Sequence, residues 1–349
     1  MSNLQARALA GALRFAFGLP APLRRLIAGP PIRLDGQDLH PEAQLLLKLQ
    51  TLTGRGWSTS TPESTRLDLE LSSKLVAGPP IAAVDTRNLK IGNFAARLYT
   101  PHKSKDTPLL IFFHGGGWVS GSLESHDQLC RFLAAEAGIK LLAADYRLAP
   151  ENPFPAAVED AQTVLEYAVK KAADLEIDPA RIVLGGDSAG GNLAAVTAHQ
   201  NPGAAVFLLL FYPGVDASVR RRSRELFGNG FFLTDEKMDW FLDHYAPGLD
   251  ERHDPRVSVM LAEDLSKMPP TYLATAGFDP LRDEGEAFAA KLAEAGVPVV
   301  LRRHEGLFHG FANILGVGGV FREAVAEAVG ALRTGLALAN SAQDLSEPA

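Results

Sequence analysis

Residues 181–198 read RIVLGGDSAGGNLAAVTA, and this stretch decides the fold. The apolar run 182–184 predicts a buried strand, and the small residues from Gly190 onward predict a helix that begins soon after it. Between them lies the pattern Gly-x-Ser-x-Gly, with Ser188 at its centre. A strand, a sharp turn and a helix in this order lift a serine hydroxyl clear of the backbone. The stretch therefore predicts a nucleophilic serine at the end of a strand.

Similar apolar runs recur along the chain, with helical patterns between most of them. The runs cover residues 109–113, 141–144, 206–211, 272–275 and 297–301. The helical patterns cover residues 124–137, 156–173, 190–200, 281–295 and 319–338. Strands that are apolar on both faces and alternate with helices indicate a parallel sheet covered on both sides. Residues 82–100 add a hairpin around Gly92-Asn93. We therefore expect an α/β fold with a mostly parallel central sheet flanked by helices.

Two segments depart from this alternation. Residues 40–76 read as helical, with Thr61 as a cap before Pro62, and the glycine and prolines of 78–80 mark a boundary. Between Val215 and Asp254 the chain carries arginines and aromatic residues that resemble a helical excursion. Such excursions lie above the carboxyl ends of the strands, where ligands bind.

A second glycine-rich motif, His114-Gly115-Gly116-Gly117-Trp118, directly follows the run 109–113. Glycines at a strand end let backbone amides approach a substrate, and this pattern forms oxyanion-hole loops. We expect the amides of Gly115, Gly116 and Ala189 to bind a developing oxyanion. A phosphate-binding loop is the alternative, but no lysine follows and the Gly-x-Gly-x-x-Gly spacing is absent.

The general base and its carboxylate partner are sought near the ends of the last strands. His309 follows the last apolar run and is preferred to His304, which lies closer to the strand. Asp279 follows the run 272–275 and is preferred to Asp283 and Glu284, whose position suits the first turn of a helix. The chain order Ser188, Asp279, His309 is the order found in α/β-hydrolases. These three residues form the predicted catalytic triad.

The motifs together resemble the hormone-sensitive-lipase-like esterases (bacterial family IV) of the α/β-hydrolase superfamily. The resemblance covers about residues 80–335. The residues that carry it are His114–Trp118, Asp145–Glu151, Phe154–Ala157 with Glu159-Asp160, Gly186–Gly191, Asp279–Glu284 and His309–Phe311. It implies a helical cap from residues 1–80 and an insertion at about 215–250, with a catalytic domain from 81–340. It also implies structural roles for Arg147 and Glu151. The composition of residues 341–349 indicates a polar tail.

The predicted function is hydrolysis of carboxylic esters through an acyl-enzyme, and the resemblance implies short- to medium-chain substrates. Aromatic residues offer walls for the substrate, and Asp187 lies beside the nucleophile. The expected pocket residues are Trp118, Asp187, Phe231, Phe232, Trp240 and Phe241. An amidase on the same triad is one alternative, and a ligand receptor on the same fold is another. The mechanism calls for no cofactor and no metal.

Charge and hydropathy limit the partners. The net charge of −7 argues against a nucleic-acid partner, and no run is long and apolar enough to span a bilayer. Residues 1–34 nevertheless carry five arginines and no acid. A helix in this segment would place Arg7 and Arg14 opposite an apolar face, which suits a membrane-surface helix or a helix packed on its own domain. We favour the second, so a membrane-associated lipase is the alternative to a cytoplasmic monomer or homodimer.

Overall fold

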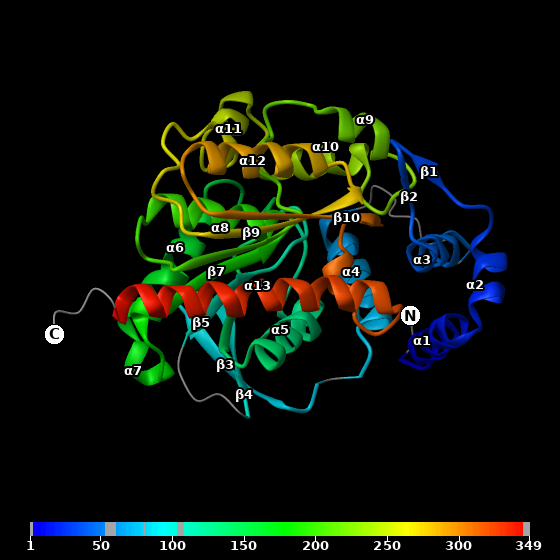
Figure 1. Cartoon of the computed structure of the whole chain (residues 1–349), viewed down its shortest axis with the longest axis horizontal. Coiled ribbons are helices and arrows are strands. Elements are labelled where there is room, and N and C mark those ends of the chain that lie inside the picture. The colour runs from blue at the N-terminus through cyan, green and yellow to red at the C-terminus, as the bar shows by residue number, and fades with distance from the viewer. Residues whose placement is uncertain (1–2, 53–60, 80, 103–107, 345–349) are drawn as a thin grey trace.

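The computed structural model describes residues 3–52, 61–79, 81–102 and 108–344, and a twisted sheet of eight strands lies at its centre (Figure 1). The strand order is β10-β9-β8-β7-β5-β6-β4-β3. Strands β5 to β10 are parallel, whereas β4 is antiparallel to both β6 and β3. The strands are β3 (Val84–Ile91), β4 (Phe94–Pro101), β5 (Leu109–Phe113), β6 (Lys140–Ala144), β7 (Ile182–Asp187), β8 (Phe207–Phe211), β9 (Thr271–Phe278) and β10 (Val299–Phe308). The predicted fold class is confirmed.

Two apolar cores lie on the two faces of this sheet. In β5, Ile111 packs into one core and Phe112 into the other, as the alternation of side chains along a strand requires. The first core includes residues of α6 (Ala156–Lys170), α8 (Ala189–Gln200) and α12 (Arg282–Glu294). The second includes residues of α5 (Leu123–Ala137) and α13 (Gly319–Asp344). All of β5 is buried, which explains its continuous apolar sequence.

The N-terminal helices gather at one side of the molecule (Figure 1). They are α1 (Asn3–Gly18), α2 (Ala21–Ala28), α3 (Pro41–Leu52) and α4 (Pro62–Val76), with the short hairpin β1 (Arg33–Leu34) and β2 (Gln37–Asp38) between α2 and α3. Thr61 caps α4 and Pro62 occupies its first turn, as predicted. Leu13 and Phe17 of α1 pack against the second core, so part of the apolar face of this helix is covered by its own chain. Residues 53–60 of the predicted helical region lie outside the described residues.

The excursion after β8 consists of three short helices above the sheet: α9 (Arg222–Phe227), α10 (Asp235–Tyr245) and α11 (Leu249–His253) (Figure 1). Thr234 caps α10 through the amide of Lys237, at 3.2 Å. Arg220 and Arg224 each contact both Asp235 and Asp239. These ion pairs hold the start of α10 against α9 and the segment before it.

Three element boundaries differ from the prediction. Strand β10 continues to Phe308, whereas the apolar run predicted an end at residue 301. The prediction was too short because β10 is an edge strand with charged residues, such as Arg302 and Arg303, that interrupt the apolar pattern. The helix expected at 156–173 ends at Lys170 and is followed by the short α7 (Ala172–Leu175). Helix α13 continues to Asp344 into the expected tail, and residues 345–349 lie outside the described part. Every helix in the described ranges is too short or too polar to cross a lipid bilayer.

Candidate active site

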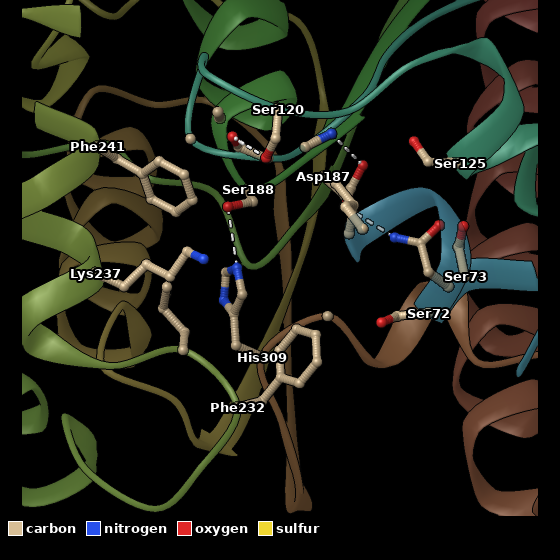
Figure 2. Close-up of a pocket in the computed structure, with 18 of the residues that line it drawn as sticks. Ser72, Ser73, Ser120, Ser125, Asp187, Ser188, Phe232, Lys237, Phe241 and His309 are labelled. Atoms are coloured by element: carbon tan, nitrogen blue, oxygen red, sulfur yellow. Dashed lines mark hydrogen bonds between the residues drawn. The ribbon is translucent and has the colours of Figure 1, made fainter. Parts of the chain in front are cut away.

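Ser188 lies at a sharp turn between β7 and α8 (Figure 2). Its backbone has φ 53° and ψ −120°, a strained conformation for a residue with a side chain. The turn is so tight that a Cβ on Gly186 would lie 2.3 Å from the carbonyl oxygen of Gly190. A Cβ on Gly190 would lie 2.0 Å from the carbonyl oxygen of Phe113. The two glycines of the motif are therefore required for the close approach of β5, β7 and α8.

The structure brings His309 and Asp279 to this serine. Asp279 directly follows β9 and His309 directly follows β10, so neighbouring parallel strands deliver both side chains to one edge of the sheet. The hydroxyl of Ser188 lies 3.0 Å from Nε2 of His309 (Figure 2), and Nδ1 of His309 lies 2.8 Å from Oδ2 of Asp279. Asp279 is fully buried, and its Oδ1 accepts the amide of Leu281 at 2.8 Å. The second oxygen of the carboxylate is thereby fixed toward the imidazole.

The rival residues have other partners. The ring of His304 packs against Phe311 at 5.1 Å. Asp283 accepts the amide of Ser223 at 2.7 Å, and Glu284 accepts the amide of Val215 at 2.7 Å. The geometry therefore favours Asp279 and His309 over these alternatives.

The glycine loop after β5 lies beside Ser188, but one expected amide is occupied. The Gly115 amide donates to Oδ1 of Asp187 at 2.9 Å, so it does not point at a substrate oxyanion as predicted. Gly116 and Gly117 both have positive φ, at 122° and 62°. Within the described ranges, no hydrogen bond is found for the amides of Gly116 and Gly117. These two amides could therefore donate to a ligand, and the amide of Ala189 at the N-terminus of α8 lies at a position that suits an anion.

Asp187 connects the glycine loop after β5 with the loop that follows β10. Besides the Gly115 amide, it contacts Nε2 of His126 at 3.2 Å and accepts from Nδ2 of Asn313 at 3.1 Å. Burial raises the pKa of Asp187, but the charge and hydrogen bond of His126 and the Gly115 amide outweigh it, so the pKa lies below its ordinary value. Asp187 lines the cavity as predicted, yet its carboxylate serves to anchor two loops.

Comparisons with known proteins agree with this arrangement. Residues 110–313 match the family described as alpha/beta hydrolase fold. The chain is 41% identical over 335 residues to the carboxylic ester hydrolase LipN of Mycobacterium tuberculosis, which covers 91% of this chain and 89% of LipN. It is 37% identical to the ethyl acetate hydrolase of Pseudomonas putida, over 75% of this chain and 86% of that protein.

The chain belongs to the hormone-sensitive-lipase-like esterases of the α/β-hydrolase superfamily. Among solved structures, a hyperthermophilic esterase from the archaeon Pyrobaculum calidifontis superposes with a TM-score of 0.79 at 35% identity, over 85% of this chain and 98% of that one. The predictions of the family, the fold and the class of serine carboxylesterase are confirmed.

The substrate cavity of this carboxylesterase has a volume of about 410 Å³, and Ser188 is one of its lining residues. Its walls come from the N-terminal helices, from the glycine loop and from α10, and they are mainly apolar. Trp118, Phe232 and Phe241 line it, as expected. Phe231 and Trp240 are not among its lining residues, which corrects the prediction. Phe231 packs instead on Phe227 and Phe278, and Trp240 packs on the ring of His244.

Other residues around the site lacked a clear sequence signal. The ring of Tyr212 packs at 4.6 Å from His309, and its hydroxyl accepts the amide of Ala312 at 3.3 Å. His126 reaches Asp187 from α5, far away in sequence. Lys237 projects into the cavity from α10.

Within the described residues, no group of three metal-ligating side chains is close enough together to hold a metal ion.

Glu284 is a fully buried carboxyl in the cavity wall of this esterase. Burial raises its pKa to about 8, although the amides of Val215 and Asp216 favour the ionised form. The folded protein therefore binds this proton between pH 4.5 and about 8, where the unfolded chain has released it. The free energy of unfolding then decreases as the pH rises through this window.

We expect the substitution Glu284→Gln to remove this dependence, because the amide oxygen can still accept both backbone amides and cannot ionise. The gain in stability over the wild type should grow from pH 5 to pH 8 and reach a few kcal/mol at most. Thermal unfolding at pH 5, 6.5 and 8 measures it, with Glu263→Gln, at an exposed position, as the control. A gain of equal size at all three pH values would contradict the raised pKa.

Proposed function

We propose that this carboxylesterase acts through an acyl-enzyme on Ser188, with His309 as general base and Asp279 as its carboxylate partner. The hydroxyl of Ser188 attacks the ester carbonyl while Nε2 of His309 takes its proton. Asp279 stabilises the imidazolium and holds the neutral ring in the tautomer that carries its proton on Nδ1, so that Nε2 can accept a proton. His309 then gives the proton to the leaving alcohol, and water cleaves the acyl-serine by the same steps. The main support is the chain of contacts of 3.0 and 2.8 Å through His309.

The amides of Gly116, Gly117 and Ala189 are proposed as the oxyanion donors. Each such donor contributes about 3–4 kcal/mol to transition-state stabilisation in related sites. The occupation of the Gly115 amide by Asp187 supports this set over the one expected from sequence. A Cβ on Gly116 would lie 2.2 Å from the carbonyl oxygen of Ser120, so a side chain at this position would displace the loop.

We further propose that the helices of residues 1–80 and the insertion at about 215–250 act as a cap over the site, as the family resemblance implies. Leu13 of α1, Leu69 of α4 and Leu242 of α10 all line the cavity that also contains Ser188. A cavity of about 410 Å³ under such a cap suits esters with short or medium acyl chains. The resemblance to ester hydrolases favours this function over an amidase.

The test of the assignment is inhibition by diethyl p-nitrophenyl phosphate. The nucleophile displaces p-nitrophenolate and keeps the diethylphosphoryl group, so the intact mass increases once per chain. Peptide mapping is expected to place this group on Ser188, with activity lost in proportion to labelling. A label on any other residue, or full labelling with activity retained, would overturn the assignment.

Three predictions stay untested. They are residence in the cytoplasm, a monomeric or homodimeric state, and the absence of membrane contact. Exposed apolar residues on α1 and α2, such as Phe15 and Leu26, keep the membrane alternative open to experiment. Co-sedimentation with anionic liposomes, with and without residues 1–34, separates a membrane-associated lipase from an enzyme that acts on dissolved esters.

A further inference from the structure

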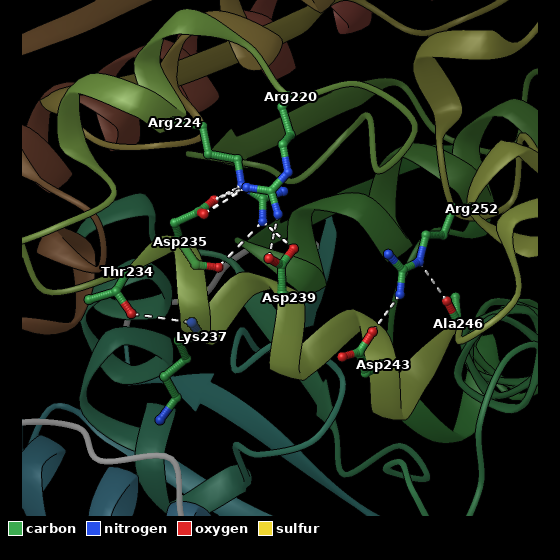
Figure 3. A network of polar contacts seen from close by, with 9 residues as sticks. All are labelled: Arg220, Arg224, Thr234, Asp235, Lys237, Asp239, Asp243, Ala246 and Arg252. Carbon is green, nitrogen blue, oxygen red and sulfur yellow. Dashed lines mark hydrogen bonds and ion pairs between the residues drawn. The ribbon is translucent and has the colours of Figure 1, made fainter.

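Lys237 is a buried lysine that the mechanism does not use. It lies on α10, is 5% exposed, and lines the same cavity as Ser188 and His309. Figure 2 shows its amine directed toward the space beside these two residues. Figure 3 shows the same side chain pointing away from the arginines and aspartates that hold α10 in place. Its charge is therefore presented to the cavity.

The position of α10 is fixed close to the reacting atoms. Phe241 lies one helical turn after Lys237, so the two side chains share a face of the helix. A Cβ on Gly117 would lie 2.2 Å from the ring of Phe241, which shows how closely this face approaches the glycine loop after β5. A substrate group that extends from the ester carbonyl along α10 would thus pass the amine of Lys237.

Two aromatic rings of α10 lie near this amine. Its nitrogen lies 5.4 Å from the ring centre of Phe241 and 5.9 Å from that of Trp240. Burial lowers the pKa of Lys237 to about 8, and the charge of Asp68 on α4 acts in the opposite direction. Most of the molecules therefore carry the ammonium at pH 7. Ionisable groups with a shifted pKa in a cleft are concentrated at functional sites.

Two acidic residues and an arginine of the cavity wall are held by ionic contacts within the protein. Asp187 contacts His126, Asp216 is paired with Arg221, and Arg224 is paired with Asp235 and Asp239. The raised pKa of Glu284 keeps it uncharged at pH 7. An anionic group that enters along α10 therefore meets an ammonium and is not opposed by an unpaired carboxylate of these residues.

We propose that Lys237 selects esters that carry a second, carboxylate group, such as monoesters of aliphatic dicarboxylic acids. This inference rests on the proposed function, since it assigns a substrate class to the same site. The ammonium would donate a charge-assisted hydrogen bond to the distal carboxylate while the ester carbonyl lies against Ser188. The chemical step is unchanged, so the effect is expected mainly in KM.

Two matched pairs of esters test the proposal at pH 7, with acid release followed in a pH-stat. Monoethyl adipate and ethyl hexanoate differ by a carboxylate on the acyl chain. The acetate ester of 4-hydroxybutanoic acid and butyl acetate differ by a carboxylate on the alcohol. For each pair, we compare kcat/KM of the acidic ester with kcat/KM of its neutral partner. In at least one pair, we expect this ratio to be at least tenfold higher for the wild type than for Lys237→Met. Lys237→Arg should restore part of the ratio.

The control is Lys48→Met, which removes an exposed lysine of α3 and should leave both ratios unchanged. Equal ratios in wild type and Lys237→Met for both pairs would overturn the proposal. Turnover of the neutral esters by wild type tests the proposed function separately, because its absence would refute ester hydrolysis itself.

A pH series that needs no substitution of Lys237 protects the test against a Lys237 variant that does not fold. KM for the preferred acidic ester should rise at least threefold between pH 7 and pH 9.5, as Lys237 loses its proton, while KM for its neutral partner stays level. Glu284, which also ionises in this range, would add to the rise, so Glu284→Gln is measured in parallel. A KM for the acidic ester that stays level in this variant contradicts a role for the ammonium.

Discussion

Replacement of Ser188 by alanine is expected to lower kcat for p-nitrophenyl butyrate by about 10⁶-fold, the loss typical of a serine hydrolase without its nucleophile. The hydroxyl is the only part of the side chain that is removed, and it contacts Nε2 of His309 at 3.0 Å. Alanine keeps the Cβ, so the turn at φ 53° experiences no new clash. The oxyanion donors and the cavity remain, so a residual rate about 10³–10⁴ above that in water should persist.

The control for this variant is Ser266→Ala, at an exposed position outside the cavity, which should keep kcat within about twofold. Thermal unfolding of both variants checks that they are folded. Ser188→Ala should also bind diethyl p-nitrophenyl phosphate without acquiring its phosphoryl group. More than 1% of wild-type kcat in a preparation free of wild-type enzyme would show that another residue is the nucleophile.

The parts of the site that could be predicted from sequence are those set by local geometry and chain order. Glycine is required at positions 186 and 190 because a Cβ there would lie only 2.3 and 2.0 Å from backbone carbonyl oxygens, so the motif itself specifies the shape of the turn. The parallel order of β7, β9 and β10 then brings the residues after these strands to one edge. For this reason Asp279 and His309 could be chosen from their positions after predicted strands.

The parts that were missed depend on contacts between distant segments. The Gly115 amide is occupied because Asp187 is held by His126 from α5 and by Asn313 after β10, and none of these contacts leaves a local pattern. Two adjacent aromatic residues of α10 show that the same limit applies to the pocket residues. Trp240 and Phe241 are adjacent in sequence, so they project about 100° apart around the helix, and only Phe241 reaches the cavity.

The substitution Asp279→Asn is expected to lower kcat by about 10⁴-fold while leaving the fold intact, a loss known for this change in serine-protease triads. Oδ1 of Asp279 accepts the amide of Leu281, so an asparagine that keeps this contact turns its NH₂ group toward His309. That group donates to Nδ1 and moves the ring proton to Nε2, which can then no longer accept the proton of Ser188. The loss should fall on kcat, because the cavity that sets KM is unchanged.

Asp283→Asn is the matched control, because Asp283 lies four residues away and binds the Ser223 amide and Arg282 instead of the imidazole. It should reduce stability through these contacts while kcat stays within about threefold. ¹⁵N chemical shifts of labelled histidine report which nitrogen of His309 carries the proton: Nδ1 in wild type and Asp283→Asn, and Nε2 in Asp279→Asn. If Asp279→Asn loses activity while the proton stays on Nδ1, the carboxylate acts through the charge it places beside the imidazolium, and the tautomer argument for this residue fails.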